Sequence, residues 1–194
     1  MARPRSEEKR TALLDAAARA VADEGMGATT ARVSRLAGVA EGTLFTYFDN
    51  KDALLNALYL HLKERLRDAV MGGFPHRGAA QAQARHAWDG YIAWGLAHPA
   101  GHRALQQLMV SERISEANRA AGSEGFAALH DVLLKRFGPV GALPAEEGLA
   151  FAGALFNAMA QAVMDAVVRN PKAADAYRDR GFTAFWAALN TGKP

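Results

Sequence analysis

The chain has 194 residues, of which 50% are hydrophobic, so it is long enough for one large domain or two small ones with a sizeable core. It has no cysteine, which excludes a disulfide framework and thiolate zinc ligands, and no stretch approaches the roughly 20 uninterrupted apolar residues of a membrane span. The net charge is +3 and the first ten residues lack the apolar core of an export signal, so we expect a cytoplasmic protein with no membrane partner.

The composition predicts an all-α protein of about nine helices, because alanine is abundant and the few prolines fall mostly at helix edges. Residues 7–22 are expected to form the first helix, which a pair of glycines ends. Its apolar stripe consists of Leu13, Leu14, Ala17 and Val21. Thr30 is expected to cap a short second helix that reaches Ala37, Gly38 forms a turn, and residues 41–48 form a third helix.

The remaining helices are longer and are separated by two linkers rich in glycine and proline. Asn50 is expected to cap a long fourth helix over residues 51–70, which the first linker, 72–78, follows. Later helices are expected over residues 80–97, 101–110, 115–137, 144–170 and 173–189, with the second linker at 138–142. Pro144 suits the first turn of its helix.

Residues 29–51 carry the strongest functional signal. Two short helices joined at a glycine turn are how helix-turn-helix proteins present one helix to the DNA major groove. Leu44 and Phe48 are four residues apart and anchor the third helix, while Thr43 and Tyr47 share a neighbouring face that can remain exposed. An ordinary helical hairpin would explain the apolar stripe but not the threonine, tyrosine, arginine and lysine gathered on one exposed face.

Cationic side chains cluster at the N-terminus and around this segment. They are Arg3, Arg5, Lys9, Arg10, Arg32, Arg35 and Lys51. Two interpretations of the N-terminal group stay open: it is a solvated chain end, or it is an arm that lies along DNA phosphates.

The stretch AGVAEGTLFTYFDNKDALL resembles the helix-turn-helix of the TetR (tetracycline-repressor) family of bacterial transcriptional regulators. The usual family pattern is close to AGVSxGTLYxYFxxKExLL, and Ala-Gly-Val, Gly-Thr-Leu, Tyr-Phe and Lys all fall at its spacing. The resemblance implies that residues 1–50, with the start of the fourth helix to about residue 67, form a DNA-binding domain. It implies that residues 51–194 form a helical domain for ligand binding and dimerisation.

Carried over position by position, the resemblance implies a set of DNA-binding residues. They are Thr30, Arg32, Arg35, Glu41, Gly42, Thr43, Phe45, Tyr47 and Lys51. Contacts to phosphate are expected from Thr30, Tyr47, Lys51 and the two arginines. Thr43 is expected to contact a phosphate or a base edge, and base contacts are expected near Glu41 and Gly42.

Three departures from the family pattern affect the operator sequence rather than DNA binding itself. Ala40 replaces the usual serine, so the third helix loses a cap worth about 1 kcal/mol. Phe45 replaces a common tyrosine, which removes a hydroxyl for phosphate and offers an apolar surface to a thymine methyl. Glu41 either accepts a hydrogen bond from cytosine or complements the helix dipole, and acidic residues at helix starts are common enough to favour the second interpretation.

The resemblance also implies a homodimer that reads a palindromic operator in double-stranded DNA, with the last two helices of each subunit forming a four-helix bundle. The candidate interface residues are Leu155, Phe156, Met159, Val163, Val167, Phe182, Phe185, Trp186 and Leu189. A pocket for a mostly apolar or aromatic small-molecule effector is implied, and its candidate residues are Trp88, Tyr91, Ile92, Trp94, Met109, Phe126 and Leu129. Ordinary core packing is the alternative for each of these residues.

Two other classes of function compete with a ligand-controlled repressor. An enzyme is not expected, because the sequence has no nucleophile elbow, phosphate-binding loop, dinucleotide fingerprint or HExxH motif. No metal site or cofactor is expected: His98 and His102 are four apart, but Pro99 breaks the helix between them. The alternative that stays open is a DNA-binding regulator or architectural protein controlled by a protein partner, with no small-molecule ligand.

Overall fold

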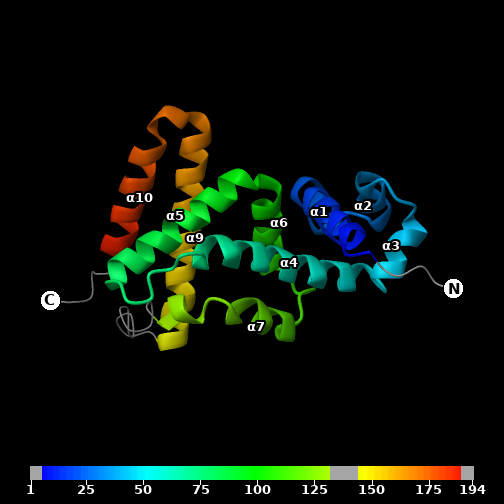
Figure 1. Ribbon diagram of the computed structural model, residues 1–194, viewed down its shortest axis with the longest axis horizontal. Helices are drawn as coiled ribbons and strands as arrows, with labels where there is room; N and C mark the ends of the chain where they lie inside the picture. The colour runs from blue at the N-terminus through cyan, green and yellow to red at the C-terminus, as the bar shows by residue number, and fades with distance from the viewer. Residues whose placement is uncertain (1–5, 132–143, 189–194) are drawn as a thin grey trace. The chain divides into compact units, whose positions relative to one another are not determined.

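The computed structural model describes residues 6–131 and 144–188, and every regular element in this part of the chain is a helix (Figure 1). The first four α-helices are α1 (Glu7–Glu24), α2 (Thr30–Ala37), α3 (Glu41–Tyr47) and α4 (Lys51–Met71). They are followed by α5 (Ala80–Ala97), α6 (Pro99–Met109), α7 (Glu116–Glu124), α9 (Ala145–Arg169) and α10 (Ala174–Ala188). Two short 3-10 helices, η1 (Gly25–Gly27) and η2 (Pro171–Ala173), precede α2 and α10. The all-α prediction is confirmed.

Most of the helix boundaries lie within two residues of those expected, with two corrections. The prediction of one continuous helix over residues 115–137 is wrong. Helix α7 ends at Glu124, and a turn at Gly125 and Phe126 separates it from the next helical residues. Apolar periodicity does not detect this break, because the spacing continues across it. Pro144 is the N-cap of α9 rather than a residue of its first turn. The second expected linker lies outside the described residues.

One compact unit contains residues 1–65 and 98–125, and so holds α1, α2, α3, most of α4, α6 and α7. Its core is aliphatic and rich in alanine. Leu13 and Leu14 of α1 are fully buried, and Leu105 and Leu108 of α6 are at most 1% exposed. Alanines at positions 16, 17 and 20 are also fully buried, which lets α1 lie close to its neighbours α2 and α6.

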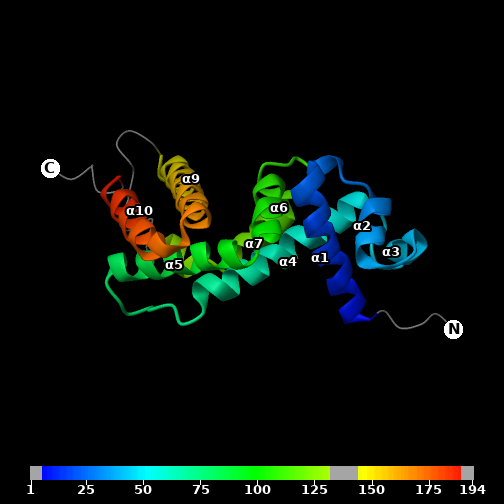
Figure 2. The ribbon, with the colours of Figure 1, turned by 90° about the horizontal axis from the view of Figure 1, so that it is seen from above.

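The other compact unit contains residues 66–97 and 126–194, with α5, α9 and α10 among its elements. Its core is aromatic. The fully buried ring of Trp88 stacks on Phe185 at 5.6 Å between centroids and meets Phe156 edge-on at 5.4 Å. Helices α9 and α10 lie side by side (Figure 2). A Cβ atom at Gly181 would fall 2.4 Å from Val163, so only glycine permits this approach of α10 to α9.

The two compact units divide the chain differently from the functional division expected from the sequence. Helices α6 and α7 belong to the same compact unit as α2 and α3, and the boundary within α4 falls between residues 65 and 66. Residues 1–50 as the DNA-binding part, and 51–194 as the part for ligand and dimer, remain a prediction about function.

Candidate DNA-binding site

The turn between α2 and α3 is determined by local hydrogen bonding. Thr29, not Thr30 as expected, caps α2: its hydroxyl accepts a hydrogen bond from the backbone N–H of Arg32 at 3.1 Å. Gly38 ends α2 with φ 68° and ψ 31°, a left-handed conformation that glycine adopts without a steric penalty. Its N–H donates to the carbonyl of Arg35, which satisfies the end of the helix.

Helix α3 is held by the two residues predicted to anchor it. Leu44 is fully buried and Phe48 is 4% exposed, whereas Thr43 and Tyr47 are partly exposed. Ala40 occupies the N-cap position and makes no side-chain capping bond, as its side chain requires. The helix is thus fixed through one apolar side, and its opposite side is open to solvent.

The hydroxyl of Tyr47 is oriented by the start of α1. It accepts a hydrogen bond from the backbone N–H of Ser6 at 3.1 Å, and Ser6 is also the N-cap of α1. A tyrosine hydroxyl that accepts one bond still has its own proton to donate, so Tyr47 remains able to bind a phosphate oxygen. No local pattern in the sequence predicts this contact, because the two residues are 41 positions apart.

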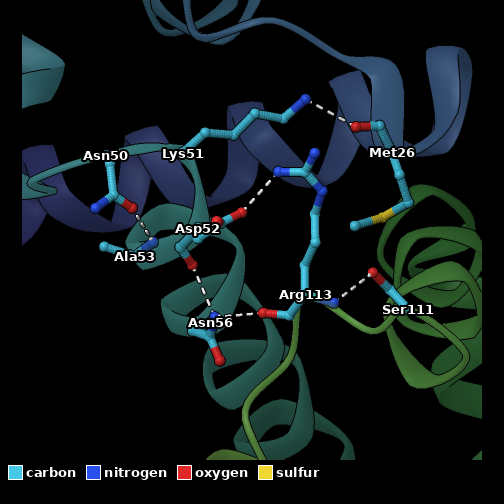
Figure 3. A network of polar contacts seen from close by, with 8 residues as sticks. All are labelled: Met26, Asn50, Lys51, Asp52, Ala53, Asn56, Ser111 and Arg113. Atoms are coloured by element: carbon cyan, nitrogen blue, oxygen red, sulfur yellow. Dashed lines mark hydrogen bonds and ion pairs between the residues drawn. The ribbon is translucent and has the colours of Figure 1, made fainter.

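The start of α4 places Lys51 beside η1, the 3-10 helix that follows α1 (Figure 3). Its ammonium group donates to the carbonyl of Met26 at 2.8 Å. An ammonium group has three donors, so this bond fixes the position of Lys51 and leaves capacity for a phosphate. Asn50 caps the helix as predicted, since its side-chain oxygen accepts from the N–H of Ala53 at 2.9 Å.

Two of the predicted phosphate contacts have acidic partners that sequence reasoning missed. Arg32 forms an ion pair with Glu24 at 2.7 Å, and the hydroxyl of Thr30 donates to Glu41 at 2.6 Å. These groups are exposed enough for DNA to displace the carboxylates, and a phosphate would then compete with an internal anion. Arg35 is exposed on the same helix as Arg32.

A polar network joins α4 to the segment between α6 and α7 (Figure 3). The amide nitrogen of Asn56 donates to the carbonyls of Asp52 and Arg113 at 2.8 and 2.9 Å. Its oxygen accepts from the backbone N–H of Ser115 and from the side chain of Asn118. Arg113 also pairs with the carboxylate of Asp52 at 2.7 Å. Three of the four bonds of this one side chain therefore connect α4 to a segment about 60 residues away in the sequence.

Comparison with known proteins identifies this arrangement. The sequence profile of bacterial regulatory proteins of the tetR family matches residues 13–58. The transcriptional regulator BetI of Escherichia coli K12 is 31% identical over an alignment of 159 positions, and the alignment covers 66% of this chain and 81% of BetI. The chain belongs to the TetR family.

Solved TetR-family structures share the fold over nearly the whole chain. A TetR regulator from Shewanella sp. PV-4 aligns with a TM-score of 0.76 and 25% identity, covering 95% of this chain and 98% of its own. A TetR regulator from Marinobacter aquaeolei VT8 aligns with a TM-score of 0.79 at 23% identity, covering 94% and 95%. The TetR-like regulator LfrR from Mycobacterium smegmatis, in complex with proflavine, aligns with a TM-score of 0.64 at 24% identity, covering 96% and 97%.

TetR proteins are DNA-binding transcriptional regulators and not enzymes, and this membership gives the same general function to the present chain. The nine residues predicted to contact DNA lie on α2, α3 and the start of α4, in one compact unit. Their individual roles on DNA remain predictions.

The candidate pocket residues do not all lie in one unit. Trp88, Tyr91, Ile92, Trp94 and Phe126 are buried and Leu129 is partly exposed, all in the aromatic unit, whereas Met109 belongs to the unit that contains α3. The side chain of Trp88 packs against α9 and α10, and its indole N–H donates to the carbonyl of Arg178 at 3.2 Å. For Trp88 the packing is that of a core residue.

The candidate dimer residues also divide into two groups. Val163, Val167, Phe182 and Phe185 are at most 7% exposed within the single chain, so the structure corrects their assignment to a surface. The apolar stripe that suggested pairing is used largely to pack α9 and α10 within one chain. Leu155, Phe156, Met159 and Trp186 are partly exposed, and Leu189 lies outside the described residues.

Proposed function

We propose that this TetR protein is a cytoplasmic homodimeric repressor that binds a palindromic operator and releases it when a small, mostly apolar or aromatic molecule binds. The observation that carries the proposal is the apolar surface of α9 that the described residues leave exposed. Two copies of the α2–α3 helix-turn-helix, related by a two-fold axis, would match a palindrome and would gain affinity from both half-sites.

Helix α9 is more apolar than a helix exposed to water is expected to be. Its segment Glu147–Arg169 reaches a mean hydropathy of 1.4 while only 28% of it is buried, so by length and composition alone it would also pass for a membrane span. Phe151 is 52% exposed and Val168 is 70% exposed. Alanines 154, 158 and 162 are exposed along the same helix, which would let a second helix approach closely. A second copy of the chain covers such a surface in a homodimer.

The proposed ligand class follows from the aromatic unit and from LfrR, a fold relative whose structure contains proflavine. Tyr91 is 5% exposed, meets Phe156 edge-on at 5.0 Å, and donates its hydroxyl hydrogen to Asn157 at 2.8 Å. Aromatic rings with a few oriented polar groups are typical of sites for flat organic molecules. The ligand would act by binding the DNA-free state more tightly than the DNA-bound state.

The dimer is tested by charging its proposed surface. Val168→Glu is expected to convert the dimer to monomer in analytical ultracentrifugation and to weaken operator binding. Val110→Glu is the matched control, because Val110 is also an exposed valine, 84% exposed, but lies in the other compact unit. A wild-type monomer at micromolar concentration, or a Val168→Glu dimer, would contradict the dimer proposal.

The operator and ligand are tested with the full chain. Selection from a random duplex library should return a palindrome, and a sequence without two-fold symmetry would argue against the paired reader. Proflavine and other planar aromatic probes should raise the melting temperature and release the selected operator in fluorescence anisotropy. Probes that stabilise the protein without changing DNA affinity would favour control by a protein partner.

A further inference from the structure

We propose that α3 reads its operator chiefly through the C5 methyl group of a thymine, which packs against Phe45 in the space left above Gly42. The inference rests on the proposed operator binding and states which chemical group of the DNA gives the sequence preference. Four observations carry it: the exposed surface of α3, the hydrogen bonds that its polar groups already make, the open space at Gly42, and the exposed ring of Phe45.

The exposed surface of α3 is small and well defined. Its exposed residues are Glu41, Gly42, Phe45 and Thr46, which recur at the spacing of one helical face. Leu44 and Phe48 hold the opposite face in the core. A base edge that approaches α3 from solvent therefore meets these four residues first.

The polar groups on this surface are already bonded within the protein. The hydroxyl of Thr46 donates to the carbonyl of Thr43 at 2.7 Å, and Glu41 accepts from the hydroxyl of Thr30 at 2.6 Å. The sequence of α3, EGTLFTY, contains no arginine, lysine, asparagine or glutamine. These four residue types make the bidentate hydrogen bonds that identify guanine and adenine. Direct reading through such bonds is therefore not available to α3.

Gly42 has no structural explanation among the residues that the structure describes. Its backbone does not have a positive φ, and a Cβ atom built on it would meet nothing within 4 Å. Glycine is among the least favourable residues inside a helix, and alanine would fit the free protein. The missing side chain leaves room for a group that comes from outside, and the family membership identifies DNA as the molecule that approaches this helix.

Phe45 supplies the apolar surface beside that space. It lies three residues after Gly42, one turn along the same face, and is 45% exposed. Burial of an exposed phenyl ring against another apolar group is favourable. The apolar group that duplex DNA presents in the major groove is the thymine methyl. A cytosine or a purine at the same position offers no methyl group, so the contact discriminates between bases.

The test replaces single thymines by deoxyuridine in the selected operator, which removes only the methyl group. Binding of the full chain is measured by fluorescence anisotropy at constant salt. One thymine in each half-site should be sensitive, with about a fourfold loss of affinity for one substitution and about 15-fold for both, as expected for buried methyl groups. Phe45→Ala should bind thymine and uracil operators equally well, with circular dichroism confirming that the helices persist.

A pair of glycine variants tests the role of the open space. Gly42→Ala should melt at a higher temperature than the wild type and bind the operator at least tenfold more weakly. Gly153→Ala is the matched control, because Gly153 is also a helical glycine whose Cβ would meet nothing within 4 Å, but it lies in α9. It should raise the melting temperature without weakening DNA binding in protein that sediments as the wild type does, and this check is needed because α9 carries the proposed dimer surface.

The inference is overturned if no thymine is sensitive to uracil, if Phe45→Ala still distinguishes thymine from uracil, or if Gly42→Ala binds as tightly as the wild type. Failure of the proposed function has a different appearance, since no operator would be selected at all. An operator that is selected with high specificity but is insensitive to its methyl groups would reject only the proposed role of Phe45 and Gly42.

Discussion

In the unit that contains α3, a hydrogen-bond network centred on Asn56 joins one helix to another, whereas the unit that contains α9 and α10 has a cluster of aromatic rings between its helices. Asn56 bridges four polar groups in the first unit. In the second, Trp88, Phe156 and Phe185 contact one another with centroid distances between 5.3 and 5.6 Å. Both units also have apolar cores, and the second has polar contacts between distant helices as well, such as Arg85 to Asp179 at 2.6 Å. The contrast is therefore between the network of Asn56 and the aromatic cluster of Trp88.

The difference matches what each unit has to do. Hydrogen bonds depend strongly on distance and angle, so a fully satisfied network fixes one arrangement of its segments. A reading helix needs such a fixed support, because DNA contacts fail when donors and acceptors are displaced. Aromatic packing depends mainly on buried area and tolerates several ring geometries. Aromatic packing therefore suits a unit that is proposed to dimerise with a second copy of the chain and to bind a ligand.

The largest effect is expected when the aromatic cluster is broken at its centre. Trp88→Ala should lower the free energy of unfolding by about 3–5 kcal/mol, because a fully buried indole is replaced by a cavity. Urea denaturation followed by circular dichroism measures the loss. Trp88→Phe keeps an aromatic ring against Phe185 and should lose less than half as much. If the two variants were equally stable, ring packing at this position would not be the main contribution.

The polar unit should respond to a change that conserves shape but reverses hydrogen-bonding character. Asn56→Asp should lower the free energy of unfolding by about 2–3 kcal/mol at pH 7, because a carboxylate replaces the amide that donates to two carbonyls. Hydrogen exchange followed by mass spectrometry should show faster exchange in residues 111–118.

The same substitution in the aromatic unit gives a matched control for Asn56→Asp. Asn157 accepts a hydrogen bond from the hydroxyl of Tyr91, and an aspartate at this position can accept the same bond. Asn157→Asp should therefore change stability by less than about 1 kcal/mol. Equal losses at the two positions would mean that the added charge, rather than the lost donor, dominates at Asn56.

The sequence predicted the helices of both units well, because apolar spacing and terminal residues are local signals. Gly38 as a left-handed turn and Asn50 as a cap follow from backbone chemistry within a few residues. Thr29 and Thr30 show the limit of such signals: either threonine can cap a helix, and which one does so depends on where the chain leaves η1. The interrupted α7 shows that regular spacing does not ensure a continuous helix.

The candidate site was predicted more completely in its residues than in their interactions. The residues of α2, α3 and α4 were named from one motif. Their partners Glu24, Ser6 and Met26 were not, because each partner lies outside the helix of the residue that it contacts. For α9 and α10 the direction of the apolar faces was also beyond the sequence. Phe182 and Phe151 are both phenylalanines at helical spacing, yet one is 5% and the other 52% exposed.

The smallest expected effect on stability comes from a charged side chain that is buried in the unit containing α3. Lys63 of α4 lies against Gly122 of α7, where an added Cβ would be 3.2 Å from its Cγ and 2.7 Å from the ring of Tyr59. Burial lowers the pKa of Lys63 to about 8. Burial also raises the pKa of Tyr59, against the opposing effect of Arg119, so the phenol stays neutral while Lys63 titrates.

Because the pKa of Lys63 is lower in the folded than in the unfolded chain, the unfolded chain binds more protons between about pH 8 and 10.4. Stability should therefore rise with pH across this window relative to Lys63→Met and Lys63→Arg, which cannot release a proton there. At pH 7 the buried charge is present in full, so the free energy of unfolding of Lys63→Met should be about 1 kcal/mol higher than that of the wild type. The expected gain is small because solvent still reaches part of the Lys63 side chain. Urea denaturation of the three proteins at several pH values measures the slope. Parallel curves would show that the amine is effectively solvated and that this unit buries polar groups at little cost.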